Sequence, residues 1–75
     1  MTEFEHWASA CADKSIPITE ITRGAAYPRT GIYMTRDGDT PWYHVFLSGR
    51  WRYSAPDLKA ANAEYQRILQ EGASA

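Results

Sequence analysis

Apolar residues near the amino terminus recur at the spacing of one helical face. The residues of this stripe are Phe4, Trp7, Ala8 and Cys11. Their i, i+3, i+4, i+7 spacing is typical of an amphipathic helix. Thr2 and Glu5 are spaced as a capping box, in which each side chain satisfies a free backbone N–H of the first turn. The pattern predicts a helix over residues 3–13.

A second apolar stripe lies near the carboxyl terminus. Its residues are Leu58, Ala61, Tyr65, Ile68 and Leu69. Ser54 is a suitable N-cap, and Pro56 and Asp57 are both favourable in a first helical turn. The pattern predicts a helix over residues 55–70, followed by a frayed tail at 72–75.

The middle of the chain carries three short runs rich in β-branched and aromatic residues. Asp37-Gly38-Asp39 separates the first run from the second, and Ser48-Gly49 separates the second from the third. Such turn signals predict a three-stranded antiparallel meander. The predicted strands cover residues 31–36, 42–47 and 50–53. Residues 14–29 contain two prolines and are expected to be irregular.

These elements predict an α+β fold in α-β-β-β-α order, formed as a single domain by residues 1–75. A chain of 75 residues is long enough for only one hydrophobic core.

The expected hairpin register makes both faces of the sheet apolar. A two-residue loop at Ser48-Gly49 places Phe46 opposite Trp51 and His44 opposite Tyr53. One face then consists of Trp42, His44, Phe46, Trp51 and Tyr53, and the other of Tyr43, Val45, Leu47, Arg50 and Arg52. A sheet with one solvated face should alternate between apolar and polar positions. We therefore expect both faces of this sheet to be covered.

The register of the first strand depends on the preceding loop. A Gly38-Asp39 loop places Ile32 and Met34 beside Val45, whereas a three-residue loop places them beside His44. The first register is preferred because it gives the last helix an aliphatic face. The aromatic face is then left to the N-terminal helix, to a second copy of the chain or to a ligand.

Composition indicates a reducing compartment and no membrane segment. Cys11 is the only cysteine, so no disulfide can form within one chain. The sequence has no signal-peptide pattern, and no apolar run approaches the ~20 residues of a membrane helix. We therefore expect a cytoplasmic protein that does not enter a membrane.

No residue set has the pattern of a catalytic or metal site. His6, Cys11, Asp37, Asp39 and His44 lack the paired short spacings of metal ligands. No nucleophile, base and orienting group can be paired from the sequence. We expect no metal, no cofactor and no enzymatic activity. A catalytic alternative would require His44 to lie in a pocket with a carboxylate or with Cys11.

The concentration of aromatic residues favours a binding function. Seven of the ten aromatic residues lie between Tyr27 and Tyr53. Tryptophan, tyrosine and arginine are enriched in interface hot spots. The sequence predicts a non-enzymatic adaptor module that acts through protein contacts, with self-association into a homodimer as one form. The predicted contact residues are Trp42 and Trp51 as apolar anchors, Tyr53 as an amphipathic edge and Arg52 as a polar rim contact.

Nucleic-acid binding is the alternative. Residues 29–53 carry four arginines against two aspartates, although the net charge of the whole chain is −1. Arginine contacts phosphates and guanine edges, and exposed aromatic rings stack on bases. The predicted residues for this function are Arg36, Arg50, Arg52 and Tyr43. The layout of residues 31–69 resembles that of plant AP2-type and phage-integrase arm-binding domains, without their sequence motifs.

Overall fold

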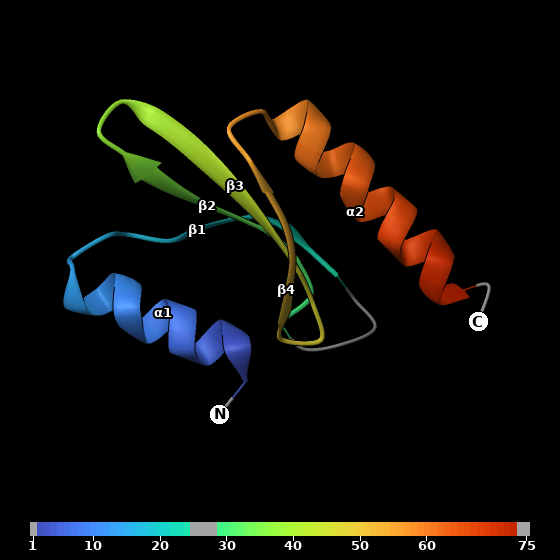
Figure 1. Ribbon diagram of the computed structural model, residues 1–75, viewed down its shortest axis with the longest axis horizontal. Coiled ribbons are helices and arrows are strands. Elements are labelled where there is room, and N and C mark those ends of the chain that lie inside the picture. Colours follow the sequence, from blue (N-terminus) through green and yellow to red (C-terminus); the bar gives the residue numbers. More distant parts are fainter. Residues whose placement is uncertain (1, 25–28, 74–75) are drawn as a thin grey trace.

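The computed structural model describes residues 2–24 and 29–73 of the chain (Figure 1). Its elements in chain order are α1 (Glu3–Asp13), β1 (Thr19–Arg23), β2 (Gly31–Asp37), β3 (Thr40–Leu47), β4 (Arg50–Ala55) and α2 (Leu58–Ala73). The strands form one antiparallel sheet in the order β1-β2-β3-β4. The α+β class is confirmed, but the prediction of three strands was wrong.

The fourth strand lies in the segment that we expected to be irregular. β1 has the sequence TEITR, and most of its residues are exposed. It pairs with β2 along one edge of the sheet. A short edge strand of this kind lacks the apolar alternation of a half-buried strand, and the pattern of its residues therefore did not predict it. The last helix begins at Leu58 and not at residue 55, because Ala55 still pairs with Tyr43 in the sheet. The tail predicted at 72–75 was wrong for residues 72 and 73, which continue α2, and residues 74–75 lie outside the described residues.

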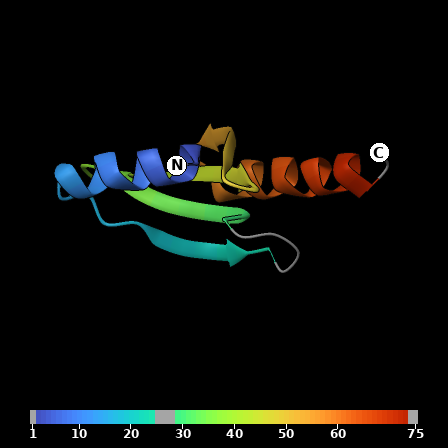
Figure 2. The same ribbon diagram turned by 90° about the horizontal axis from the view of Figure 1, so that it is seen from below.

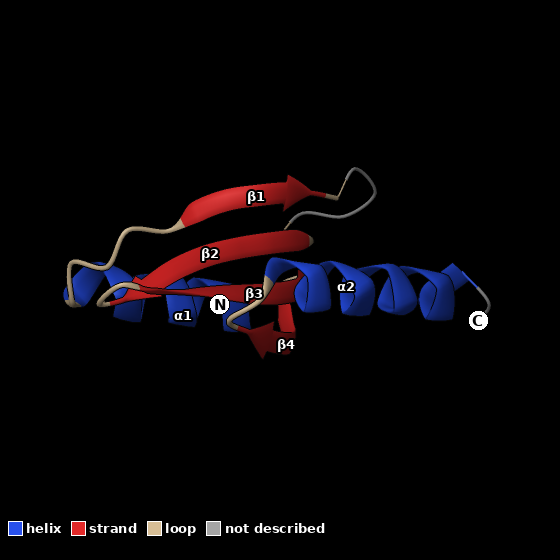
Figure 3. Cartoon of the chain, turned by 90° about the horizontal axis from the view of Figure 1, so that it is seen from above, coloured by secondary structure: helices blue, strands red, loops and turns tan. Residues whose placement is uncertain are grey.

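The two helices lie on opposite faces of the sheet. Figure 1 views the sheet edge-on, with α1 on one side and α2 on the other. Figures 2 and 3 show that both helices lie alongside β2, β3 and β4, whereas β1 extends away from them. The expectation that both faces are covered is confirmed, and each face is covered by a helix of the same chain.

The α2 face is the aliphatic one. Ile32 lies opposite Val45, and Asp37 lies opposite Thr40, so the preferred Gly38-Asp39 loop is confirmed. The buried cluster on this face consists of Ile32, Val45, Ala61, Tyr65 and Ile68, with Tyr43, Leu47 and Tyr53 packed against it. Ala61, Tyr65 and Ile68 of the stripe expected from the sequence are buried in this cluster, whereas Leu58 and Leu69 of that stripe are partly exposed.

The α1 face is aromatic. Its buried cluster contains Phe4, Tyr33 and Phe46. The Phe4 ring centroid lies 4.8 Å from that of Tyr33 and 5.0 Å from that of Phe46. Trp7 packs beside them, with its ring 5.0 Å from Phe46. Tilted and edge-to-face contacts of this kind contribute beyond the burial of the rings.

A β-bulge in β4 changes the register that we expected. The hairpin starts as predicted, with Leu47 opposite Arg50 and Phe46 opposite Trp51. The register then shifts, so that Tyr53 faces Val45 and Ser54 faces His44. The expected pairing of His44 with Tyr53 was therefore wrong. One extra residue rotates the rest of a strand onto the opposite face. Tyr53 consequently packs towards α2, away from Trp51.

The hairpin turn also anchors the N-terminus of α1. The predicted capping box between Thr2 and Glu5 is present. The backbone N–H of Phe4 donates to the carbonyl of Gly49 over 2.8 Å. Gly49 has a φ of +82°, and a Cβ there would lie 2.9 Å from the Thr2 Cβ. Glycine is therefore required twice, by the turn and by the close approach of α1.

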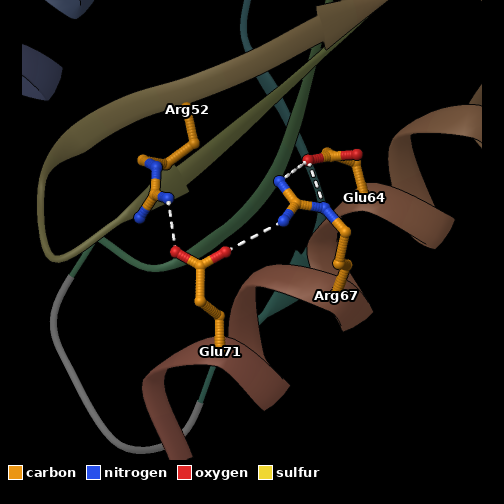
Figure 4. A network of polar contacts seen from close by, with 4 residues as sticks. All are labelled: Arg52, Glu64, Arg67 and Glu71. Carbon is orange, nitrogen blue, oxygen red and sulfur yellow. Dashed lines mark hydrogen bonds and ion pairs between the residues drawn. The ribbon is translucent and has the colours of Figure 1, made fainter. Parts of the chain in front are cut away.

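An ion-pair network joins β4 to α2 (Figure 4). The Arg52 Nη2 atom lies 3.5 Å from Glu71 Oε1, and the Arg67 Nη1 atom lies 2.9 Å from Glu71 Oε2. Arg67 also pairs with Glu64 one turn earlier. Arg67 and Glu71 are exposed, and Arg52 and Glu64 are partly exposed, so water screens these pairs and they contribute little to stability. The network orients Arg52 towards α2.

Substitution of Phe4 tests whether α1 is an integral layer. Phe4→Ala should lower the free energy of unfolding by about 3–5 kcal/mol, because it removes a buried ring from the aromatic cluster. Urea denaturation followed by circular dichroism measures this change. Ser9→Ala, on the exposed side of α1, should change the value by no more than about 0.5 kcal/mol. Equal effects of the two substitutions would show that α1 is not needed to cover the sheet.

Candidate functional site

Trp51 is the large aromatic residue that the fold leaves at the surface of the α1 face. Its relative exposure is 51%, whereas Phe46 opposite it is 1% exposed. The indole Nε1–H of Trp51 donates to Ser54 Oγ over 2.7 Å, and its backbone N–H donates to Glu3 Oε1 over 2.5 Å. The ring is thus exposed and also held in one orientation.

Two adjoining hollows meet at Trp51. The first, which we call the aromatic hollow, has a volume of about 430 Å³ and is lined by Glu3, Trp7, His44, Phe46 and Trp51. The second, which we call the edge hollow, has a volume of about 630 Å³ and is lined by Thr2, Glu3, Ser48, Gly49, Arg50, Trp51 and Arg52. Glu3 and Trp51 line both. The site therefore lies where the first turn of α1 meets the start of β4.

A series of hydrogen bonds connects the Trp51 indole through Ser54 and His44 to Thr35. Ser54 Oγ, which accepts the indole N–H, lies 2.8 Å from His44 Nδ1. His44 Nε2 lies 2.9 Å from Thr35 Oγ1. In a neutral imidazole one ring nitrogen donates and the other accepts, and a hydroxyl group can do either. The neutral ring of His44 therefore joins the Ser54 and Thr35 hydroxyl groups in both of its tautomers.

Burial favours this neutral form of His44. The ring is half-buried beside Trp7, with the two centroids 5.0 Å apart. Desolvation lowers the pKa of His44 below its usual value of 6.5. The imidazole therefore acts at neutral pH as an uncharged bridge between two hydroxyl groups.

Ser54 and His44 form a hydroxyl–imidazole pair that sequence reasoning missed, because it depends on the bulge in β4. His44 also lines the aromatic hollow together with Glu3, which is the arrangement that the catalytic alternative required. However, the other nitrogen of the ring contacts the Thr35 hydroxyl. A neutral hydroxyl does not stabilise an imidazolium as a carboxylate does. The Ser54 oxygen is moreover engaged by the Trp51 indole. We interpret the pair as support for Trp51.

The remaining candidate groups lie apart from this site. Cys11 is buried, and desolvation raises the pKa of its thiol, which disfavours the reactive thiolate. Within residues 2–24 and 29–73, no three His, Cys, Asp or Glu side chains are grouped as metal ligands. In that same part of the chain, neither helix has the length and apolar character needed to cross a bilayer.

The structure divides the four residues predicted to form the protein contact. Strand alternation places Trp42 and Trp51 on the α1 face. Tyr53 packs against the aliphatic cluster on the α2 face, and Arg52 reaches Glu71 of α2. Arg52 still lines the edge hollow beside Trp51. Glu3, Trp7 and Ser54 were missed, since only the tertiary contact between α1 and β4 brings them to Trp51.

Of the four residues predicted to bind nucleic acid, only Arg50 and Arg52 lie together, at the edge hollow. Arg36 lies opposite Pro41 and Arg50 lies opposite Leu47, at the two ends of β3. Six residues of strand separate these positions by about 20 Å, at about 3.3 Å per residue. Arg52 is paired with Glu71, and Tyr43 is packed against the aliphatic cluster. Nucleic-acid binding stays a prediction.

Comparison with known proteins adds no family to this description. No protein-family model, no curated protein and no solved structure matches the chain. The interpretation of the site therefore depends on its own geometry and chemistry.

The half-buried imidazole predicts a pH dependence of stability. His44 has a lower pKa in the folded chain than in the unfolded chain, so the unfolded chain binds more protons. The free energy of unfolding should be fully retained above about pH 6.5 and should fall as the pH decreases from there towards the folded pKa. Urea denaturation between pH 5 and pH 8 measures this dependence.

The matched variants for this measurement are His44→Gln and His6→Gln, the second of which removes an exposed imidazole. His44→Gln should flatten the dependence, and His6→Gln should not. A wild-type free energy of unfolding that does not change over this pH range would contradict a lowered pKa of His44 in the folded chain.

Proposed function

We propose that this chain is a non-enzymatic binding module that acts through a protein contact centred on Trp51. The observation that carries the proposal is the state of this residue: its ring is half-exposed, is held by the indole hydrogen bond to Ser54 and lies between two hollows, while its backbone N–H is bound by Glu3. A rigid tryptophan supplies a large contact area and loses little conformational entropy on binding. Such residues dominate the binding energy of protein interfaces.

The proposed contact involves an edge of the sheet and not one of its faces. Each face already carries a helix, with α1 over the aromatic cluster and α2 over the aliphatic one. A partner is therefore not needed to shelter the sheet. The proposed surface is the junction of α1 and β4, where Trp51 is the anchor and Arg50 and Arg52 form a charged rim. An apolar centre with a polar rim is the usual anatomy of an interface.

Strand pairing is not the proposed mode of contact at β4. Glu3 accepts the outward N–H of Trp51, and the bulge after Trp51 interrupts the ladder. Both features obstruct the addition of another strand at this edge. Recognition through side chains in the hollows is the mode that this geometry favours.

Self-association is the form of the proposal that is simplest to test. If a second copy is the partner, Trp51→Ala should shift the monomer–dimer equilibrium towards monomer by a factor of about 30 or more, the loss expected for a hot spot of about 2 kcal/mol. Lys59→Ala, on the exposed side of α2, should leave the equilibrium unchanged. Sedimentation equilibrium measures both variants. A chain that stays monomeric at high concentration would exclude the homodimer and leave a different protein as the partner.

Peptide selection tests the proposal for a different partner. Peptides selected from a random displayed library on the full chain should bind Trp51→Ala at least about tenfold more weakly. They should bind Leu69→Ala normally, because this variant truncates another partly exposed apolar residue, on α2. Fluorescence anisotropy of the labelled peptides gives the affinities. Peptides that bind Trp51→Ala as tightly as wild type would overturn the Trp51-centred contact.

A further inference from the structure

The aromatic hollow has an unusual combination of linings. Four of its five lining residues are aromatic: Phe46 is almost fully buried at its base, and Trp7, His44 and Trp51 are the rings with exposed surface. The fifth residue, Glu3, is the only charged one among them. The faces of aromatic rings carry negative electrostatic potential and attract cations, most strongly for tryptophan. The aromatic rings and the Glu3 carboxylate therefore both favour a positively charged ligand in this hollow.

The carboxylate of Glu3 is available for a second interaction. Its Oε1 atom accepts the backbone N–H of Trp51. Among the residues that the structure describes, Glu3 makes no ion pair, although the other acids near the sheet edges, Glu20 and Glu71, each contact an arginine. Glu3 and Trp7 are four residues apart on α1, so they lie on the same side of the helix and face the hollow together. An incoming cation would meet both.

The lining rings are held in place before any ligand arrives. The Trp7 ring packs against Phe4, Phe46 and His44 at centroid distances of 5.5, 5.0 and 5.0 Å. The Trp51 ring is fixed by its bond to Ser54, and His44 is fixed through both ring nitrogens. His44 is uncharged at neutral pH and adds no positive charge to the wall. A preformed site loses less free energy to ordering on binding.

We infer that the aromatic hollow takes an arginine side chain of the protein partner, with its guanidinium stacked against tryptophan and paired with Glu3. This inference rests on the proposed function and names the chemistry of its partner. A planar guanidinium is weakly hydrated and both stacks on aromatic rings and bonds to carboxylates, which suits it to this lining better than a compact ammonium.

Other occupants fit the lining less well. An aliphatic side chain would cover the rings but would remove water from the Glu3 carboxylate without giving it a partner, which is costly. An anion would meet the same carboxylate and the negative faces of the rings. The volume of about 430 Å³ accommodates the guanidinium together with part of its methylene stem.

The test is a titration of the full chain with a small probe and its neutral isostere. N-acetyl-arginine methylamide is the probe, and N-acetyl-citrulline methylamide has nearly the same shape without the charge. Indole N–H signals of Trp7 and Trp51 in ¹H–¹⁵N spectra report binding. We expect saturable shifts of both signals, with an affinity for the arginine probe about three- to tenfold above that for citrulline. Equal affinities would overturn the inference, as would shifts confined to other residues.

A charge-matched pair of variants separates Glu3 from the general charge of the chain. Glu3→Gln keeps an acceptor for the Trp51 N–H and removes the charge from the hollow, so arginine-probe affinity should fall about threefold or more towards that of citrulline. Asp13→Asn removes one charge at the other end of α1 and should leave the affinity unchanged. Equal losses in both variants would count against a local pairing with Glu3. The wild-type comparison of the two probes needs no variant to fold.

Arginine-to-citrulline exchange in the selected peptides tests the cationic ligand separately from the Trp51-centred contact. Arginine-to-citrulline exchange in the selected peptides should weaken their binding by a similar three- to tenfold factor. Peptides that depend on Trp51 but tolerate citrulline at every arginine would leave the protein contact standing and overturn the cationic ligand. Peptides whose affinity is unchanged by Trp51→Ala would overturn the proposed contact itself.

Discussion

The central strand of this protein is apolar on both sides, and the other layers follow from that constraint. Val45 and Phe46 are adjacent in β3 and point to opposite faces, and each is almost fully buried. Water cannot solvate either face favourably, so each must be covered. One helix can cover only one face. The chain therefore places its two helices on opposite sides of the sheet and forms three layers with only 75 residues.

Covering both faces leaves the edges of the sheet as the exposed parts of its backbone. The two edges differ. β1 is short and polar, with a bulge at Ile21 that brings Glu20 and Arg23 together in an ion pair. β4 carries a bulge and gives one outward N–H to Glu3 of α1. Charges, bulges and covering groups are the usual means of protecting a strand edge. At β4 the same devices create the surroundings of Trp51.

The bulge in β4 connects the fold to the proposed function. It turns Tyr53 into the core on the α2 face and brings Ser54 opposite His44. Ser54 can then hold the Trp51 indole, while His44 bridges Ser54 and Thr35. A residue that would otherwise be a loose surface tryptophan is thereby fixed beside the first turn of α1. The same contacts that stabilise the hairpin shape the aromatic hollow.

The local pattern of apolar and turn residues in the sequence was sufficient to predict much of the fold. The apolar stripes predicted both helices, the turn residues predicted both hairpins, and the loop at Gly38-Asp39 gave the correct register of β2. The polar strand β1 was missed because its pairing depends on β2 and not on any periodicity of its own.

The sequence by itself determined that both sides of the sheet would be sheltered and that Trp51 would lie near the start of a strand. Only the tertiary structure decided which side chains surround Trp51. Glu3 and Trp7 are more than forty residues away in the chain, and Ser54 faces His44 through a bulge. Spacing along a sequence cannot report a register shift or a contact between distant segments, because both are set by the packing of the whole chain.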